Sequence, residues 1–460
     1  MSDAAADLSA ELGGGGGGGG GVFIGEAAPV DLAAGGYVEH ECAAAGTATS
    51  YVANSELTGD GRWSFAPDAD APYRTRVVVR RPADGAAFSG TVIVEWLNVS
   101  GGLAASPDWT SLHEEIMRAG HVWVGVSAQR IGVMGGPVLV GVQAEGAELA
   151  GKGLRAIDPG RYGSLDHPGD GFSFDIFTQV GRALRSGAAI DGTSAERVLA
   201  IGESQSAFAL VSYYNGVQPL TNAFDGFLVH SRGAFGLPLV GHEEHANLAG
   251  SFGGTPTIFR DDLTAPVLNI QTETDVVGVF NSFGARQPDT DRFRLWEVAG
   301  TAHADQHLLG PTAASIDCGA PINNGPMHIV AKAALRGLVT WVDDGRAPAI
   351  APRLEVKAGT PAEVMRDADG IALGGIRTPP VDVPVATLSG QPGPNPSMIC
   401  FLLGSTLPFT PERLADLYPS RAAYLEQYEA STDATITSGF ALPEDRAAML
   451  AFAEPGRIAT

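Results

Sequence analysis

The stretch Val198-Leu-Ala-Ile-Gly-Glu-Ser-Gln-Ser-Ala207 runs from an apolar segment, through a turn of small residues, into a segment of helical character. Gly202 and Ser206 flank Ser204 two residues away on each side. A tight strand-to-helix turn of this kind needs small neighbours and lifts a serine hydroxyl above the carboxyl edge of a sheet. The helix N-terminus beneath it favours developing negative charge. The stretch therefore predicts Ser204 as a nucleophile; a buried serine that caps the helix is the alternative.

Apolar runs alternate with helix-like segments on both sides of this turn. The predicted strands are 76–80, 90–96, 121–127, 197–201, 224–230, 266–271 and 293–298. The predicted helices are 107–119, with Ser106 as N-cap, 173–185, 204–214 and 326–342, followed by helical stretches at 411–431 and 443–453. This alternation indicates an α/β fold, in which helices cover both faces of a mainly parallel sheet.

Composition indicates a globular protein with an acidic surface. Of 460 residues, 44% are hydrophobic and 18% charged, and the formal net charge is −23. Such a charge repels phosphate backbones and anionic lipid, so we expect neither nucleic-acid nor membrane-surface binding. The chain has no apolar run of about 18 residues, the length that a membrane-spanning helix needs. With no signal peptide in the chain as given, the default expectation is a cytoplasmic protein, or a secreted one if a leader has been removed.

The three cysteines exclude a disulfide scaffold. Cys318 and Cys400 are a possible bridge, and free buried thiols are an equally good reading.

A serine hydroxyl needs a base, and the best-placed histidine is His303. It follows the last predicted strand, and the order Ser…Asp…His along the chain is the one found in this type of architecture. His307 is the second choice. We expect Ser204 Oγ and His303 Nε2 to lie within hydrogen-bonding range, about 2.6–3.2 Å.

The acid that orients the imidazole is expected after the strand at 266–271. Asp275 lies on the loop that follows this strand, whereas Glu273, the alternative, still lies close to the strand end. For the oxyanion hole we expect the backbone N–H of Gln205, and a second N–H from Asn98 or Val99 in the glycine-rich loop after the strand at 90–96.

Taken together, several motifs resemble a large, mostly bacterial α/β-hydrolase-domain family, and the resemblance runs from about residue 37 to the end. It implies the α/β-hydrolase fold and supports Ser204, in the elbow Gly-Glu-Ser-Gln-Ser, as nucleophile and His303 as base. The motifs that carry it are Val94-Glu-Trp-Leu-Asn-Val-Ser-Gly-Gly102, Pro107-Asp-Trp109, Val124-Gly-Val-Ser-Ala-Gln129, Asp158-Pro-Gly-Arg-Tyr-Gly163, His167-Pro-Gly-Asp170, Gly202-Glu-Ser-Gln-Ser-Ala207, Phe224-Asp-Gly-Phe-Leu-Val-His-Ser-Arg-Gly233, Pro321-Ile-Asn-Asn-Gly-Pro326 and Gly374-Gly-Ile-Arg-Thr-Pro379.

The predicted organisation has three parts. Residues 1–21, with glycine at every position from 13 to 21, are expected to form a flexible leader. Residues 22–346 form the α/β-hydrolase core, with cap insertions at 131–171 and 231–262. Residues 347–460, which are rich in proline, form a C-terminal extension packed on the core; the resemblance implies that this extension belongs to the family.

Candidate pocket residues lie in or beside the two insertions and at the strand ends. For each, plain packing is the competing interpretation; His230, for example, fits a hydrogen-bonded core histidine equally well. The candidates are Glu203, His230, Tyr162, His167 and Asp170, with Phe235 and Phe252 as further possibilities.

These residues predict a serine carboxylic-ester hydrolase that needs no cofactor or metal and acts on a small-molecule ester. The same apparatus also serves a lactonase, an amidase or carbamate hydrolase, a polyester hydrolase or an acyltransferase. A metal-dependent hydrolase that uses His242 and His245 with Glu243 and Glu244 is a weaker hypothesis, as is a non-catalytic binding protein. Oligomeric state is left open.

Overall fold

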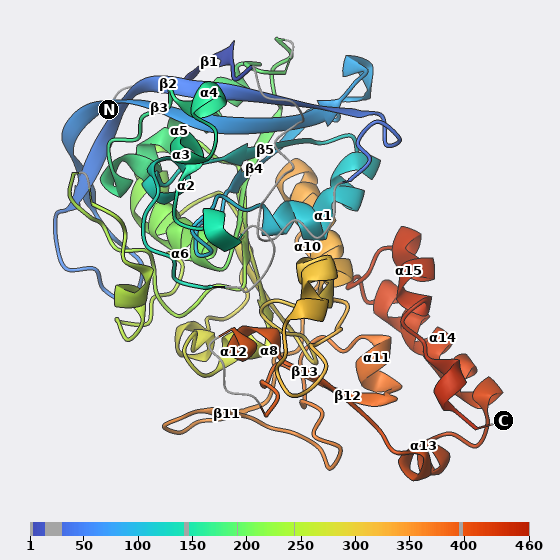
Figure 1. Cartoon of the computed structure of the whole chain (residues 1–460). Coiled ribbons are helices and arrows are strands. Elements are labelled where there is room, and N and C mark those ends of the chain that lie inside the picture. The colour runs from blue at the N-terminus through green and yellow to red at the C-terminus, as the bar shows by residue number, and fades with distance from the viewer. Residues whose placement is uncertain are drawn as a thin grey trace.

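The computed structural model describes residues 3–13, 30–141, 147–190, 192–242, 244–394 and 399–459. Within them, one large sheet of nine strands has the order β1-β2-β3-β5-β4-β6-β7-β8-β9 (Figure 1). Its strands are β1 (Asp7–Glu11), β2 (Tyr37–Ala53), β3 (Phe65–Pro82), β4 (Thr91–Trp96), β5 (Val122–Val126), β6 (Arg197–Glu203), β7 (Gly226–His230), β8 (Val267–Thr272) and β9 (Phe293–Val298).

The six strands β4 to β9 form the parallel part of this sheet. All neighbouring pairs in the series β5-β4-β6-β7-β8-β9 are parallel, whereas β1, β2 and β3 pair antiparallel at one edge. The predicted mainly parallel α/β sheet is therefore confirmed. Its parallel strands bring the carboxyl ends of β6, β7, β8 and β9 to one edge, where the loops that follow them meet.

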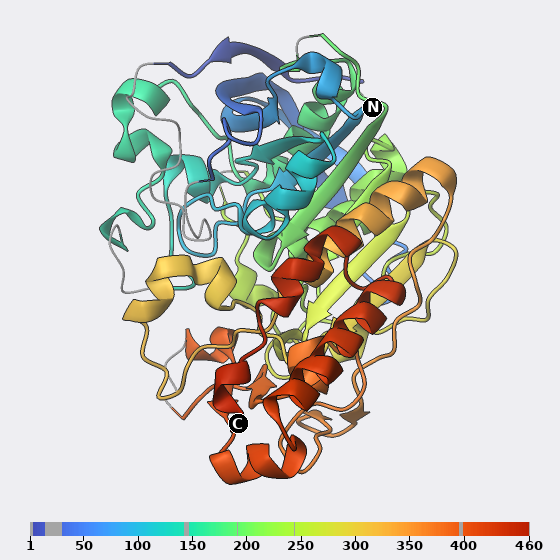
Figure 2. The same ribbon diagram turned by 90° about the vertical axis from the view of Figure 1, so that its right-hand side faces the viewer.

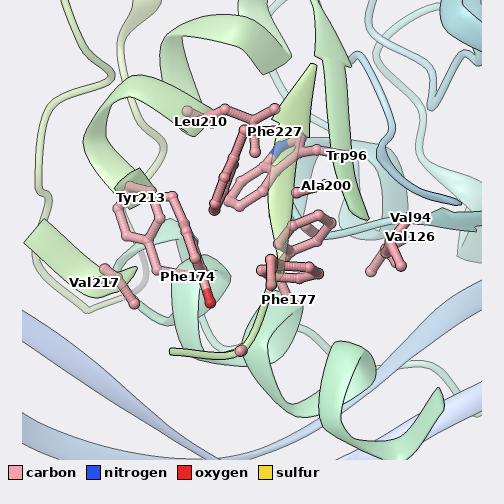
Figure 3. Close-up of a cluster of buried hydrophobic side chains, with 14 of the residues drawn as sticks. Val94, Trp96, Val126, Phe174, Phe177, Ala200, Leu210, Tyr213, Val217 and Phe227 are labelled. Atoms are coloured by element: carbon pink, nitrogen blue, oxygen red, sulfur yellow. The ribbon is translucent and has the colours of Figure 1, made fainter. Parts of the chain in front are cut away.

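Alternate residues of the parallel strands pack against helices on opposite faces of the sheet. Val94, Trp96 and Ala200 face α5 (Ser173–Arg185) and α6 (Gln205–Ser212). Figure 3 shows this layer, with Phe174, Phe177 and Phe227 gathered around Trp96. The intervening Ile93 and Leu199 face α1 (Pro107–Arg118) and α10 (Met327–Asp344). Burial on both faces explains why these strands read as almost unbroken apolar runs.

The start of α1 differs from the prediction in its cap. Ser106 makes no capping hydrogen bond through its side chain. The buried carboxyl group of Glu95, on β4, instead accepts hydrogen bonds from the backbone N–H groups of Asp108 and Trp109, at 3.1 and 2.9 Å. A remote carboxyl group thus satisfies free N–H groups of the kind that every helix start presents.

The predicted flexible leader, residues 1–21, is partly wrong, because some of its residues belong to the sheet. Residues 7–11 form β1, which pairs with β2, so this part of the segment 1–21 is ordered in the sheet. Leu8 and Leu12 are buried there, which accounts for the pairing. Residues 14–21, most of the glycine run, lie outside the described residues.

The C-terminal extension packs beside α10 and below the sheet (Figure 2). Lys332 of α10 forms an ion pair with the buried Asp445 at 2.9 Å, and Phe440 packs edge-on against Trp296 of β9. A disulfide joins Cys318 to Cys400, which resolves the alternative left open by the sequence. The extension comprises β10 (Val356–Lys357), β11 (Glu363–Val364), α11 (Pro379–Asp382), β12 (Ala386–Ser389), α12 (Cys400–Leu403), β13 (Ser405–Pro408), α13 (Pro411–Leu417), α14 (Arg421–Thr437) and α15 (Arg446–Leu450).

Among the described residues, no helix combines the length and the apolar character needed to cross a membrane. The division of the chain into leader, core and extension otherwise stays a prediction.

Candidate active site

Ser204 occupies the turn between β6 and α6 in a strained conformation. Its backbone angles are φ 58° and ψ −120°, a region that residues with a side chain rarely adopt. Its N–H donates to the carbonyl oxygen of His230, at the end of β7, at 2.9 Å. A Cβ added to Gly202 would come within 2.9 Å of Ser206 Cβ, so the turn accepts only a small residue there. The local sequence therefore sets the strain that projects the Ser204 hydroxyl.

The His303 imidazole lies beside this hydroxyl, with Nε2 2.8 Å from Ser204 Oγ. On its other side, Nδ1 lies 2.6 Å from Asp275 Oδ1. The predicted contact between Ser204 and His303 is thus confirmed. With the carboxylate accepting the Nδ1 proton, Nε2 is free to accept the proton of the serine hydroxyl.

Asp275 is held in place by hydrogen bonds other than its contact with His303. It lies in α8 (Glu273–Val276), and its Oδ2 accepts hydrogen bonds from the N–H and the hydroxyl of Thr272, both at 2.7 Å. Burial raises the pKa of the Asp275 carboxyl, but the neighbouring His303 and the bonds from Thr272 outweigh burial and lower this pKa overall. Asp275 therefore stays ionised beside the imidazole at neutral pH.

The alternative acid, Glu273, points away from His303. Its carboxylate accepts hydrogen bonds from the N–H groups of Gly300 and Gly390, at 3.0 and 2.9 Å, and it also binds Arg366 and Ser389. Glu273 thus joins the C-terminal extension to the core. The second-choice base, His307, stacks on His328 with ring centroids 3.7 Å apart.

The loop after β4 lies against the start of α6, as the oxyanion-hole prediction requires, but its donors differ in availability. The N–H of Asn98 donates to Ala105 O at 2.9 Å, so Asn98 is wrong as a backbone donor. The N–H of Val99 donates to the side-chain oxygen of Gln205 at 3.2 Å. Gln205 opens α6, and the N–H of a first helical residue has no acceptor within the helix. Gln205 and Val99 remain the predicted pair.

Comparison with known proteins agrees with this architecture. A family model described as an alpha/beta hydrolase domain matches residues 10–451. The chain belongs to this α/β hydrolase family. The match confirms the resemblance noted from the motifs and the predicted fold. No curated protein has a sequence significantly similar to the chain.

Among solved structures, the chain is similar to an α/β serine hydrolase from Xanthomonas campestris that is described as lacking a lid. The two are 13% identical over 54% of this chain and 83% of that one, with a TM-score of 0.27. It is also similar to a fungal esterase from Rhizomucor miehei, at 11% identity over 65% and 84% of the two chains, with a TM-score of 0.31. At these TM-scores the likenesses add nothing to the family match.

A second histidine of this α/β hydrolase lies close to the nucleophile. His230 pairs with Glu203 across β6 and β7, and its Nδ1 lies 2.9 Å from Asp108 Oδ1. The sequence analysis quoted Asp108 only as part of the motif Pro107-Asp-Trp109 and did not identify it as a site residue. Burial, followed by the charges of Asp108 and Asp275, raises the pKa of the Glu203 carboxyl well above its ordinary value. The protonated form of Glu203 is therefore favoured beside Ser204.

Three predicted pocket residues have structural roles instead. Tyr162 donates its hydroxyl to Glu41 and packs in a separate cluster around Leu165. His167 Nε2 lies 2.8 Å from Ala128 O, and its Nδ1 accepts the Gly169 N–H. Asp170 accepts the N–H groups of Arg130 and Ala246, at 2.7 and 2.8 Å. Apart from Gly169, these partners come from remote segments. Because they occupy the three side chains, we assign Tyr162, His167 and Asp170 structural roles.

Phe280 is a site residue that the sequence analysis missed. Its ring stacks on His303 at 4.3 Å, and it also packs against Phe208 and Phe252. Phe252, a predicted pocket residue, thus lies in the aromatic cluster that reaches the imidazole. Phe235 is buried in the core cluster of the same face.

The residues of the metal hypothesis do not converge. His242 Nε2 lies 3.7 Å from Asp68 at the surface, whereas His245 Nε2 lies 3.3 Å from Arg130. Glu244 accepts the Gly241 N–H, and Glu243 lies outside the described residues. In the described parts of the chain, no cluster of three His, Cys, Asp or Glu side chains is arranged to hold a metal ion.

Proposed function

We propose that this protein is a serine carboxylic-ester hydrolase that works through an acyl-enzyme on Ser204. The observation that carries the proposal is the continuous hydrogen-bonded series from Asp275 through His303 to Ser204, with links of 2.6 and 2.8 Å. An unassisted hydroxyl is a poor nucleophile, and a base oriented by a buried carboxylate is the arrangement that activates it.

In the acylation step, Ser204 Oγ bonds to the ester carbonyl carbon while its proton passes to His303 Nε2. The N–H of Gln205 stabilises the oxyanion, joined by the N–H of Val99 once its bond to the Gln205 side chain is released. As the intermediate collapses, the carbon–oxygen bond to the alcohol breaks, and His303 delivers the proton to the departing oxygen.

In the deacylation step, water attacks the acyl group while His303 accepts one of its protons. Collapse of this second intermediate releases the carboxylic acid and returns the proton to Ser204. Asp275 stabilises the imidazolium formed in each half-reaction. Lactones, amides, carbamates, polyesters and acyl transfer to another acceptor would share this acyl-enzyme, so the ester is proposed as the simplest substrate class.

The test is hydrolysis of short p-nitrophenyl esters by the wild type and by Ser204→Ala. We expect Ser204→Ala to lose at least about 10⁴-fold in kcat, because removing a triad member has effects of this size in serine hydrolases. Ser206→Ala is the matched control: this second serine of the turn is buried, and its hydroxyl has no hydrogen-bond partner among the described residues. Ester cleavage that survives in Ser204→Ala contradicts the proposal.

A further inference from the structure

Two buried polar side chains next to Ser204 take no part in the proposed mechanism. Glu203 ends β6 and His230 ends β7, and the two residues are paired in register between these parallel strands. Both lie on the face of the sheet that α1 and α10 cover, because Ile201 and Leu228, two residues before them, pack in that layer. The side chains of Glu203 and His230 are therefore neighbours.

This pair lies close to the nucleophile. Glu203 directly precedes Ser204, and the carbonyl oxygen of His230 accepts the Ser204 N–H at 2.9 Å. Burial raises the pKa of the Glu203 carboxyl, followed by the charges of Asp108 and Asp275, so Glu203 lies within electrostatic range of the proposed triad acid. A substrate group that contacts Glu203 or His230 is therefore close to the ester bond that Ser204 attacks.

Glu203 and His230 are only 4% and 5% exposed, yet both keep polar atoms that are unpaired among the described residues. His230 Nδ1 lies 2.9 Å from Asp108 Oδ1, which leaves Nε2. In the part of the chain that the structure describes, neither this Nε2 nor either carboxyl oxygen of Glu203 has a hydrogen-bond partner. Asp108 Oδ2 is sealed from solvent, whereas these three atoms border accessible space. Buried polar groups are normally satisfied, so this pair indicates a place for a polar group of a ligand.

The hydrogen-bonding capacity of the pair identifies the group that fits it. With Asp108 accepting the Nδ1 proton, neutral His230 presents Nε2 as an acceptor. The protonated form of Glu203 is favoured, so its carboxyl presents an O–H donor. If this proton passes to His230, donor and acceptor change places, but the pair still offers one of each. A hydroxyl group donates one hydrogen bond and accepts another, so it matches both arrangements.

Other substrate groups match the pair less well. Asp108, Asp275 and Asp305 all contribute to the raised pKa of Glu203 through their charges, and the same charges repel a carboxylate or phosphate. An ammonium group only donates, so it leaves the Glu203 O–H without an acceptor. A methyl group satisfies none of the three unpaired atoms.

We propose that Glu203 and His230 form a subsite for a hydroxyl group of the substrate, and that the enzyme prefers esters with a hydroxyl close to the ester bond. The hydroxyl donates to His230 Nε2 and accepts from the Glu203 carboxyl, while Asp108 positions the imidazole. The inference rests on the proposed ester hydrolysis and adds its specificity. The hydroxyl can belong to the acid part of the ester, as in a hydroxy acid, or to the alcohol part, as in a diol.

The first experiment uses the wild type and pairs of esters in which a methyl group replaces the hydroxyl. Ethyl lactate against ethyl isobutyrate tests the acid part, and hydroxyethyl propionate against propyl propionate tests the alcohol part. Dividing each ratio of kcat/KM by the ratio of the hydroxide-catalysed rates removes differences in intrinsic reactivity. We expect one pair to favour the hydroxyl ester by about 10-fold to 100-fold, because a polar site that is left unpaired costs about this much. The pair that responds identifies the part of the ester that carries the hydroxyl.

Glu203→Met and Glu203→Gln are the matched variants, and their readout is this preference rather than the rate itself. Methionine has a similar size but no O–H, so Glu203→Met should lose most of the preference. The amide of Glu203→Gln both donates and accepts, so this variant should keep most of it. A merely structural role of Glu203 would change the rates of both esters alike and leave their ratio unchanged.

Three results overturn the proposal: a wild type that cleaves both esters of each pair without preference, a preference that persists in Glu203→Met, and a stronger preference for protonated ethyl alaninate than for ethyl lactate and hydroxyethyl propionate. The wild-type comparison decides even if the variants do not fold. Failure of the proposed function gives a different result, since no ester of either pair is then cleaved, and the subsite is refuted with it.

Discussion

The Phe280 ring lies face to face with the His303 imidazole, with centroids 4.3 Å apart and planes inclined by 21°. Ser204 and Asp275 hold the two ring nitrogens of the same imidazole. The histidine is therefore constrained at both nitrogens and on one face. Such constraint favours catalysis because the proton acceptor starts close to the geometry in which it acts.

Replacing Phe280 by leucine should lower kcat by about 10-fold to 100-fold with a smaller change in KM, since a small misplacement of a catalytic group has effects of this size. Ester hydrolysis measured over a range of substrate concentrations separates the two constants. Phe440→Leu, which removes an aromatic contact with the remote Trp296, is the matched control. Equal kcat in the Phe280 variant and the wild type would show that the stacking has no positioning role.

Asp275→Asn should lower kcat by roughly 10⁴-fold, because the amide can donate to Nδ1 and so favour the wrong imidazole tautomer. Glu273→Gln tests the alternative acid. Because Glu273 binds Arg366 and two backbone N–H groups, this change should lower Tm but leave most of the ester-hydrolysing activity of the folded enzyme. If the Glu273 variant loses far more kcat than the Asp275 variant, the assignment of the acid is wrong.

Glu203→Gln should stabilise the protein at alkaline pH. Burial raises the pKa of Glu203 well above its ordinary value of 4.5, so the folded state keeps this proton to a higher pH than the unfolded chain does. The contribution of this proton to the free energy of unfolding is therefore complete below pH 4.5 and falls as the pH rises above that value. The neutral amide does not titrate.

Thermal unfolding of the wild type and Glu203→Gln should accordingly give similar Tm values in acid and a higher Tm for the variant at pH about 8. A difference in Tm that is the same at every pH would mean that Glu203 does not titrate between the folded and unfolded states.

The disulfide between Cys318 and Cys400 should contribute roughly 2–4 kcal/mol to the free energy of unfolding, since it closes a loop of 82 residues. A reductant should lower the Tm of the wild type and of Cys42→Ala, whose free thiol is buried. The double variant Cys318→Ala, Cys400→Ala should start at a lower Tm and show no response. If a reductant also lowers the Tm of the double variant, the fall in Tm does not come from this disulfide.

The sequence predicted the parts of the site that depend on local pattern. Gly202, Ser204 and Ser206 lie between an apolar strand and a helix, so the turn could be recognised without any remote contact. His303 and Asp275 follow strands of the parallel sheet, whose carboxyl ends share an edge, so their approach to Ser204 followed from topology.

The errors involve contacts that local sequence pattern does not reveal. The N–H of Asn98 looked available because its bond to Ala105 arises from a fold of the loop. Tyr162 looked like a pocket residue because its acceptor, Glu41, lies on β2, a strand that the sequence analysis did not predict. Phe280 carried no local signal, since one aromatic residue in a loop does not indicate which ring it will meet.

The most direct test of the account is covalent labelling by a fluorophosphonate, which reacts with an activated serine. Intact mass and peptide mapping should find one label per chain, on Ser204, formed much more slowly in Asp275→Asn and not at all in Ser204→Ala. A folded wild-type protein that acquires no label, or acquires it on another residue, would contradict the claim that His303 and Asp275 activate Ser204.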